Sequence, residues 1–161
     1  MTSPKTSEKL AEISVPFGRR MIGVIMLVGL GSLLVYAGAG APNAALGPMF
    51  ILMLAGGFSI FIGYRLYQAT AHQIYLSEDA LWCSDGTHIC DVADIEALNR
   101  GVFAMKPSNG FTIVLKTKAS ALFYPGLFWR VGRRIGVGGV VRGAEAKPMA
   151  EMIETMMHAA R

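Results

Sequence analysis

The sequence predicts an α+β membrane protein, with an N-terminal two-helix transmembrane hairpin followed by a small antiparallel β domain that a C-terminal amphipathic helix caps. Three observations lead to this fold class. Two long apolar runs without charged residues lie between Met21 and Tyr64. Short runs of β-type residues follow Gln68, and the last segment carries apolar residues at helical spacing. A chain of 161 residues has room for such a hairpin and one small domain.

The two apolar runs are long enough to cross a bilayer. The first covers residues 21–39 and the second residues 46–64, and neither contains Asp, Glu, Lys or Arg. A helix rises about 1.5 Å per residue, so about 20 apolar residues reach across the hydrocarbon layer. The connection over residues 40–45 is short and also uncharged. Together these features predict a transmembrane helical hairpin over residues 19–67.

Small residues recur on the second apolar run. Ala55, Ser59 and Gly63 are four residues apart, a spacing that lets another helix approach closely. Gly23 and Gly31 form a weaker stripe of the same kind on the first run. We expect close helix packing at these positions, either within the hairpin or between two copies of the chain in a homodimer.

The charges that flank the apolar runs predict the orientation of the protein. Arg19 and Arg20 precede the first run and Arg65 follows the second, whereas the connection is uncharged. Because positive residues remain on the cytoplasmic side, we expect a multi-pass protein of the cytoplasmic (inner) membrane with both termini in the cytoplasm. Residues 1–18 are expected to form a polar N-terminal tail. The alternative, a cleaved signal peptide ending near Ala37-Gly38-Ala39, is disfavoured because the apolar run is longer than such peptides usually have.

The region after Gln68 has the pattern of short strands separated by turns. Asp85-Gly86 lies between two β-type runs and predicts a hairpin with a two-residue type I′ turn. Val92–Asp94 is expected to be a brief turn or helical step, and Lys106–Gly110 a turn. The segments expected to be extended are 73–77, 80–84, 87–91, 95–103, 111–116, and two further strands within 121–128 and 129–137.

The C-terminal segment returns to helical periodicity. Pro148 is expected in or just before the first turn of this helix, where a missing N–H does no harm. Glu151 and Glu154 fall outside the apolar face. The apolar face itself is expected to consist of Met149, Met152, Ile153, Met156 and Met157.

This order of elements resembles the small bacterial membrane-flanked pleckstrin-homology-like (bacterial PH) proteins with two transmembrane helices. The resemblance rests on Ile74-Tyr-Leu-Ser-Glu-Asp-Ala-Leu81, on the segment from Ile89 to Ile95 and on the helix from Met149, and it covers most of residues 21–160. It implies a cytoplasmic PH-like domain over residues 70–161, in which the C-terminal helix plugs the open end of a small barrel or bent sheet. The family has no common catalytic residues to assign here.

Two groups of residues suggest a binding site, and each has a simpler explanation. The type I′ register would place Cys83 opposite His88, with Cys90 on the same face, as in the beginning of a zinc site. A fourth ligand is not evident, and half-buried cysteines beside a polar neighbour account for the pattern, so no metal site is predicted. The glycines of residues 132–139 lack the Gly-Lys-Ser/Thr ending of a phosphate-binding loop and fit tight turns better.

No set of residues in the sequence has the pattern of an active site. His72, His88 and His158 are scattered, and no serine or cysteine has the context of a nucleophile. The sequence therefore predicts a non-enzymatic protein with no catalytic residues, no cofactor and no small-molecule substrate.

Charged residues of the predicted β domain are segregated along the chain. Residues 78–96 contain six acids and no Lys or Arg, whereas residues 100–142 contain eight bases and no acid. Such a charge distribution orients a domain toward an anionic bilayer or partner. The alternative is that the acidic and basic segments are neighbours in one sheet and neutralise each other. The candidate lipid- or partner-binding residues are Trp129, Arg130, Arg133, Arg134 and Arg142.

These features favour a membrane-anchored scaffold or accessory protein at the cytoplasmic membrane face, which binds anionic lipid or a membrane-protein partner. The alternative is a small accessory subunit of a larger transporter or respiratory membrane complex, in which the hairpin forms the interface. The formal charge of +4 also suggests nucleic acid, but membrane topology accounts for much of this excess. A nucleic-acid partner is therefore not expected.

Overall fold

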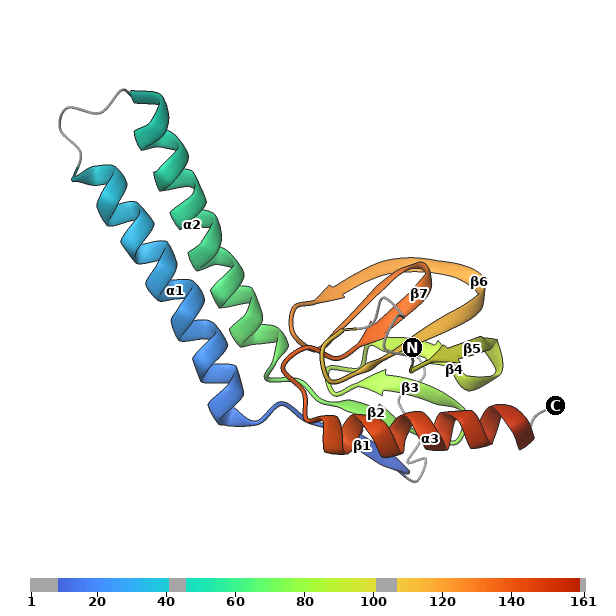
Figure 1. The fold of residues 1–161 in the computed structure, drawn as a ribbon. Coiled ribbons are helices and arrows are strands. Elements are labelled where there is room, and N and C mark those ends of the chain that lie inside the picture. Colours follow the sequence, from blue (N-terminus) through green and yellow to red (C-terminus); the bar gives the residue numbers. More distant parts are fainter. Residues whose placement is uncertain (1–8, 41–45, 101–106, 160–161) are drawn as a thin grey trace. The chain divides into compact units, whose positions relative to one another are not determined.

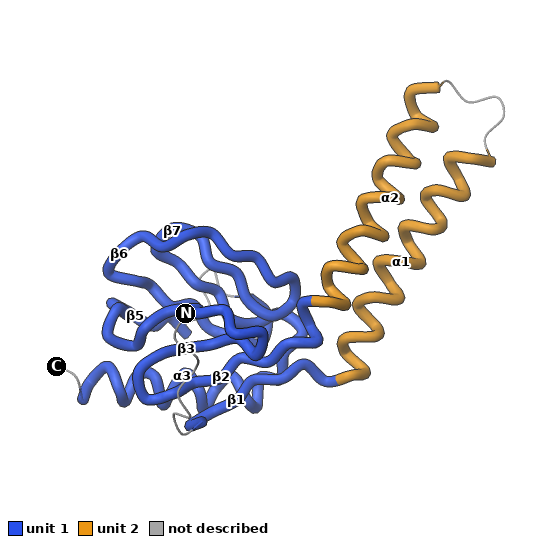
Figure 2. Tube along the Cα trace, turned by 180° about the vertical axis from the view of Figure 1, so that it is seen from behind, with its two compact units in different colours: residues 1–16, 69–161 blue, residues 17–68 orange. Residues whose placement is uncertain are grey.

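The computed structural model describes residues 9–40, 46–100 and 107–159. The elements in chain order are β1 (Ala11–Ile13), α1 (Phe17–Ala39), α2 (Leu46–Ala69), β2 (Ile74–Leu76), β3 (Ala80–Cys83), β4 (His88–Asp91), the 3-10 turn η1 (Val92–Asp94), β5 (Ile95–Asn99), β6 (Phe111–Tyr124), β7 (Phe128–Val137) and α3 (Gly143–Ala159) (Figure 1). They form two compact units, Phe17–Gln68 and Met1–Pro16 with Ala69–Arg161 (Figure 2). The predicted order of two long apolar helices, antiparallel sheets and a C-terminal helix is confirmed.

The first unit is the pair α1 and α2, which have 23 and 24 residues and are both long and apolar enough to span a membrane. Only 11% of the most apolar stretch of each helix is buried within the protein. Large side chains such as Ile22 (62% exposed) and Phe58 (66% exposed) face outward. Water would penalise this exposure, whereas the hydrocarbon layer of a bilayer does not.

The two helices pack through small residues. A Cβ atom added at Gly31 would lie 2.7 Å from the backbone oxygen of Gly56, so the two backbones touch directly. Farther along, the Ser59 hydroxyl donates a hydrogen bond to the Leu27 oxygen (2.8 Å), and the backbone of α1 lies close to Gly63. Gly56, Ser59 and Gly63 form a row with i, i+3, i+7 spacing. Ala55 is exposed and lies outside this contact within the hairpin, so a role of Ala55 in a contact with a second copy of the chain stays a prediction.

The first turn of α1 and the last turn of α2 are joined by one side chain. Arg20 Nη2 donates a hydrogen bond to the Tyr67 oxygen (2.9 Å), and its guanidinium lies 4.1 Å from the centre of the Tyr67 ring. An arginine over a tyrosine ring gains a cation–π attraction in addition to the hydrogen bond. The hairpin is therefore closed at the ends that carry its positive charges.

The second unit includes a strand from the segment that the sequence assigned to a polar tail. β1 pairs antiparallel with β2, with Ala11 opposite Leu76 and Ile13 opposite Ile74. Ile13 is fully buried, so the tail assigned to residues 1–18 is wrong at β1. The helix pair is consequently inserted between two paired strands. Three residues (14–16) connect β1 to α1, and four residues (70–73) connect α2 to β2.

Two antiparallel sheets and α3 form the rest of this unit. The strand orders are β1-β2-β3-β4 and β5-β6-β7, and α3 contacts β1 of the first sheet and β5 and β6 of the second. Apolar side chains from both sheets and the helix meet in one core. Its fully buried members include Ile13, Ile74, Leu81, Phe111, Ile113, Ile135, Met149 and Ile153.

The β3–β4 hairpin forms around Asp85-Gly86, but with a different turn from the one predicted. Gly86 N donates to the Cys83 oxygen and Cys83 N to the Thr87 oxygen, which gives a three-residue loop. Gly86 has φ +86°, whereas Asp85 has no positive φ, so the turn is not type I′. A bulge follows, because Trp82 pairs with His88 while Leu81 pairs with Cys90.

Strand β6 is a single 14-residue strand where the sequence suggested two shorter ones, over 111–116 and within 121–128. Its pairing with β7 is irregular between Val114 and Leu122, and Gly132 on β7, opposite Ala119, has φ +60°. A bulged strand bends, and this irregularity explains why the segment did not look continuous in the sequence. The end of the extended segment predicted over 95–103 lies outside the described residues.

Helix α3 begins at Gly143, about one turn earlier than predicted, so Pro148 is its sixth residue. The missing N–H of Pro148 leaves the carbonyl of Ala144, an exposed residue, without its usual helical partner. Met149 and Ile153 are buried as expected, but Met152 is 41% exposed and the buried face is completed by Ala146 and Ala150. Glu145 in the first turn accepts hydrogen bonds from Ser14 N (2.7 Å) and Ser14 Oγ (3.0 Å).

Candidate functional site

Arg130 is a buried structural side chain. It is 8% exposed, and its guanidinium donates hydrogen bonds to the Ser120 oxygen (2.8 Å), to Ser120 Oγ (3.0 Å) and to the backbone oxygens of His88 and Ile89. These acceptors belong to β6 and β4, so Arg130 connects the two sheets. With its donors used inside the protein, Arg130 does not offer a free guanidinium to a lipid headgroup, which corrects its assignment as a binding residue.

Two other bases of the basic segment over residues 100–142 also have intramolecular partners. Arg133 forms an ion pair with Glu96 on β5 and donates to the Leu115 oxygen (2.8 Å). Lys116 donates to the Ala93 oxygen (2.6 Å). One acid of the acidic segment, Glu96, thus pairs with one base of the basic segment within the same sheet, which is the kind of contact that the alternative interpretation expects.

Arg142 lies apart from the strand arginines, at the residue before α3. It pairs with Glu145 at 3.3 Å while its side chain remains 55% exposed. An exposed ion pair of this kind contributes little to stability, so Arg142 remains largely available to solvent. The structure therefore does not bring the five candidate residues together as one exposed patch.

One member of the set, Arg134, is exposed and makes no ion pair with any described residue. It lies on the outer face of β7, together with Gly136 two residues further on. The Trp129 indole packs against Gly136, where no side chain competes for the space. Phe123 is paired with Trp129 across the strands, and Val131 is on the same face. We call this group, Phe123, Trp129, Val131 and Arg134, the β6–β7 outer face.

The β6–β7 outer face is unusually apolar for the exterior of this unit. Phe123 and Val131 are each 62% exposed, and Trp129 is half-buried. Exposed apolar residues that occur singly need no explanation, but a cluster with an aromatic ring and a cation is typical of a contact surface. The sequence selected Trp129 and Arg134 as binding residues. It noted Phe123 as an aromatic residue of the basic segment but did not select it, and it missed Val131, because the direction of both side chains depends on the register of β6 and β7.

The cysteine cluster considered in the sequence is not formed. Trp82, not Cys83, is opposite His88, and the His88 ring contacts the Trp82 ring (centroids 4.6 Å apart) and Asp91 (2.9 Å). Cys83 and Cys90 are both buried. The three-residue turn shifts the pairing by one position, so His88 points to the opposite face from both thiols.

A different cluster forms around the β3–β4 turn. Donor atoms of His72, Cys83 and Asp85 all lie within 4.8 Å of one another. Asp85 accepts hydrogen bonds from Thr87 N (2.9 Å) and from the Tyr124 hydroxyl (2.6 Å). His72 reaches this place from the connection between α2 and β2, a position that strand periodicity in the sequence did not reveal.

The protonation states of this cluster are set by burial and by the turn. Burial raises the pKa of the Cys83 thiol to about 11, and the charge of Asp85 adds to this effect. Burial also opposes ionisation of Asp85, but the hydrogen bonds from Tyr124 and Thr87 outweigh it and lower the pKa to about 2. Burial raises the pKa of the Cys90 thiol to about 12. Both thiols are therefore protonated at neutral pH and are weak nucleophiles.

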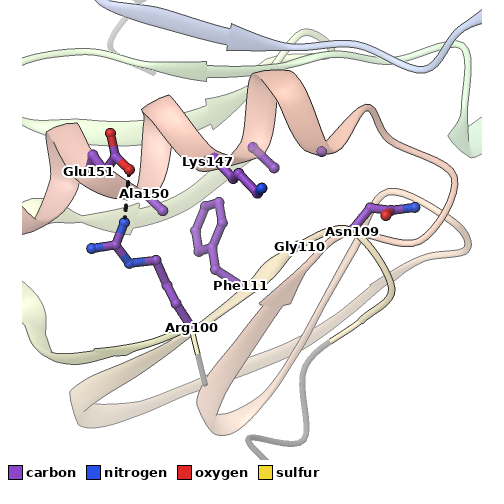
Figure 3. A pocket seen from close by; sticks show the side chains of 9 residues that line it. Arg100, Asn109, Gly110, Phe111, Lys147, Ala150 and Glu151 are labelled. Atoms are coloured by element: carbon purple, nitrogen blue, oxygen red, sulfur yellow. Dashed lines mark hydrogen bonds and ion pairs between the residues drawn. The ribbon is translucent and has the colours of Figure 1, made fainter. Parts of the chain in front are cut away.

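A surface pocket of about 420 Å³ lies between the first half of α3 and the start of β6 (Figure 3). Phe111 and Ala150 form its apolar side, and Lys147 lies at its edge. Arg100 lines the pocket but is already paired with Glu151 and Glu154 of α3. Among the described residues of the pocket wall, Arg100 already has its acidic partners and Lys147 is the other basic side chain. These residues do not indicate which ligand, if any, the pocket would bind.

Comparison with protein-family models, with curated protein sequences and with solved structures found no match to this chain.

Proposed function

We propose that the protein is a non-enzymatic scaffold or accessory protein of the cytoplasmic membrane, whose β domain docks on anionic lipid through the β6–β7 outer face. In this proposal the β domain is PH-like, which is supported by two antiparallel sheets that share a C-terminal helix. The observation that carries the proposal is the β6–β7 outer face, which exposes Phe123 and Val131 beside Trp129 and Arg134.

The short connections between the β domain and the helix pair support lipid as the binding partner of the β6–β7 outer face. Three residues join β1 to α1 and four join α2 to β2, so a bilayer that holds the helices is always within reach of the domain. Short linkers give effective concentrations in the millimolar range. Each Lys or Arg near an anionic surface contributes about 1 kcal/mol, and apolar area removed from water contributes about 25 cal/mol per Å². A tethered domain needs only these small gains to dock.

The same geometry changes which residues are expected to bind. Arg130 and Arg133 have partners inside the β domain, so replacing them would change contacts within the domain as well as any contact with lipid. A soluble fragment of the β domain that begins at Ala71 is unsuitable for the test, because it would lack β1 and have a cavity where the Ile13 side chain is buried. The test therefore needs the full chain and a variant at Arg134.

The experiment is Trp129 fluorescence in the full chain reconstituted into vesicles whose acyl chains carry bromine as a quencher. The chain has two tryptophans, and Trp82→Phe leaves Trp129 as the single probe. We expect quenching in vesicles with anionic lipid at low salt and less quenching in zwitterionic vesicles or at high salt. Arg134→Gln should weaken the quenching. Arg142→Gln, which removes an equally basic side chain outside the β6–β7 outer face, should leave it unchanged.

Quenching that ignores lipid charge, or that responds equally to Arg134→Gln and Arg142→Gln, would overturn the lipid contact. The accessory-subunit alternative would then be favoured, and co-purification of a partner in fixed ratio would test it.

The proposed orientation has its own test. A reporter fused after Arg161 should be active only if it works in the cytoplasm, and a cysteine at Asn43, which lies outside the described residues, should react with an external reagent. An externally active C-terminal reporter would contradict the orientation.

A further inference from the structure

His72, Cys83 and Asp85 bring three different donor types to one point of the β domain. Their imidazole nitrogen, sulfur and carboxylate oxygen all lie within 4.8 Å of one another. Zinc is bound in proteins by this combination of nitrogen, sulfur and oxygen donors. We propose that these three residues form a binding site for a thiophilic divalent cation, with Zn²⁺ as the best match, independently of the lipid contact.

The backbone holds the two segments of this site together. Ser84 N donates to the Gln73 oxygen (2.9 Å), and Gln73 N donates to Ser84 Oγ (3.2 Å). These bonds fix the residue after His72 against the residue between the other two ligands. In the proposed site, rotation of the three side chains brings the donors from separations within 4.8 Å to tetrahedral spacing around the cation.

The carboxylate of Asp85 is already oriented. Its two oxygens accept hydrogen bonds from Thr87 N and from the Tyr124 hydroxyl, and each carboxylate oxygen retains a further lone pair for a cation. Tyr124 is held in turn by stacking on Phe128, with ring centroids 4.6 Å apart. Partners of this kind orient metal ligands, and their loss typically weakens metal affinity by about 10- to 100-fold.

Binding would displace the proton of Cys83, which leaves for solvent as the sulfur–metal bond forms. Three protein ligands leave one tetrahedral position for water. Cys90 takes no part in the set, because it pairs with Leu81 on the other side of the bulge. The chain therefore contains a matched control cysteine, which is also buried.

The experiment titrates the full chain in detergent, after treatment with a chelator, with Co²⁺ as a spectroscopic probe and then with Zn²⁺ as competitor. We expect one Co²⁺ per chain, a sulfur-to-cobalt charge-transfer band, visible bands of tetrahedral cobalt, and loss of both on addition of one Zn²⁺. Cys83→Ser and His72→Gln should abolish the charge-transfer band or the binding. Cys90→Ser should leave both intact. Tyr124→Phe should weaken binding by about 10-fold or more while it leaves the ligands in place.

Absence of a thiolate band in the wild-type chain would overturn the proposal, as would an unchanged titration of His72→Gln. His72→Gln decides the matter if Cys83→Ser fails to fold, because His72 lies in a connection and not in a strand. A band that disappears in Cys90→Ser and persists in Cys83→Ser would assign the metal to another site and also overturn the proposal.

Discussion

In the helix pair the bulky apolar side chains are exposed and the glycines at the contact are buried, whereas in the β domain the bulky side chains are buried and several glycines occupy turns. Phe58 of α2 is 66% exposed, and Phe111 of β6 is 1% exposed. Gly31 and Gly56 let two helices touch, while Gly86 and Gly126 provide positive φ in hairpin turns. The same residue types therefore serve opposite purposes, because one unit carries its bulky apolar side chains on the outside and the other carries them in a core.

The two phenylalanines provide the sharpest test of this difference. Phe111→Ala should destabilise the β domain by about 3–5 kcal/mol, because it removes a fully buried ring from the core. Phe58→Ala should change the stability of the β domain by less than about 0.5 kcal/mol. Chemical denaturation of the full chain in detergent, followed by the fluorescence of the two tryptophans, measures both. Equal losses would show that Phe58 is packed inside the protein and that α2 is not a lipid-facing helix.

Neighbouring glycines on α2 offer a second comparison. A Cβ atom at Gly56 would lie 2.7 Å from the Gly31 oxygen, whereas one at Gly57 would have nothing within 4 Å. Gly56→Val should therefore separate the helices and cost about 1–3 kcal/mol through overpacking. Gly57→Val has the same helix propensity and should leave the thermal stability in mild detergent nearly unchanged. A larger loss in Gly57→Val would mean that its face contacts another helix, for example in a second copy of the chain.

Two arginines of β7 allow a buried side chain that stabilises the β domain to be compared with an exposed one. Arg130→Gln leaves the Ile89 and Ser120 oxygens without their charged donor and should cost about 1–3 kcal/mol of stability. Arg134→Gln should leave the unfolding midpoint within error, because Arg134 is exposed. Denaturant unfolding of the two variants measures both changes in stability. If Arg134→Gln is the more destabilising, the assignment of the two side chains is reversed.

The sequence was sufficient to predict those elements whose pattern extends over many residues or depends only on neighbouring residues. Charge-free runs of about 20 residues identified α1 and α2, and Asp85-Gly86 located the β3–β4 turn. The three-residue turn could not be read from the sequence, because a one-residue shift of the pairing leaves the composition unchanged but places His88 opposite Trp82 and not Cys83. Charge segregation marked Arg130 and Arg134 alike, since only the register of β7 distinguishes an inward guanidinium from an outward one.

The strand β1 was missed for a different reason. Three residues flanked by charged and polar neighbours carry too short a pattern to stand out, and their partner β2 is more than 60 residues away across the helix pair. The β domain is thus interrupted, not preceded, by the apolar helix pair. This insertion creates the two short connections, residues 14–16 and 70–73, on which the lipid proposal depends.

Hydrogen exchange of the full chain in detergent tests this insertion most directly. Leu10 N donates to the Leu76 oxygen at 2.9 Å, and β1 pairs with β2 along its length. Since β1 is the edge strand of its sheet, we expect the amides of residues 10–13 that face β2 to be protected to a degree similar to those of β2, and both to lose protection together in Phe111→Ala. Rapid exchange at residues 10–13 beside a protected β2 would contradict the insertion and restore the N-terminal segment to a tail.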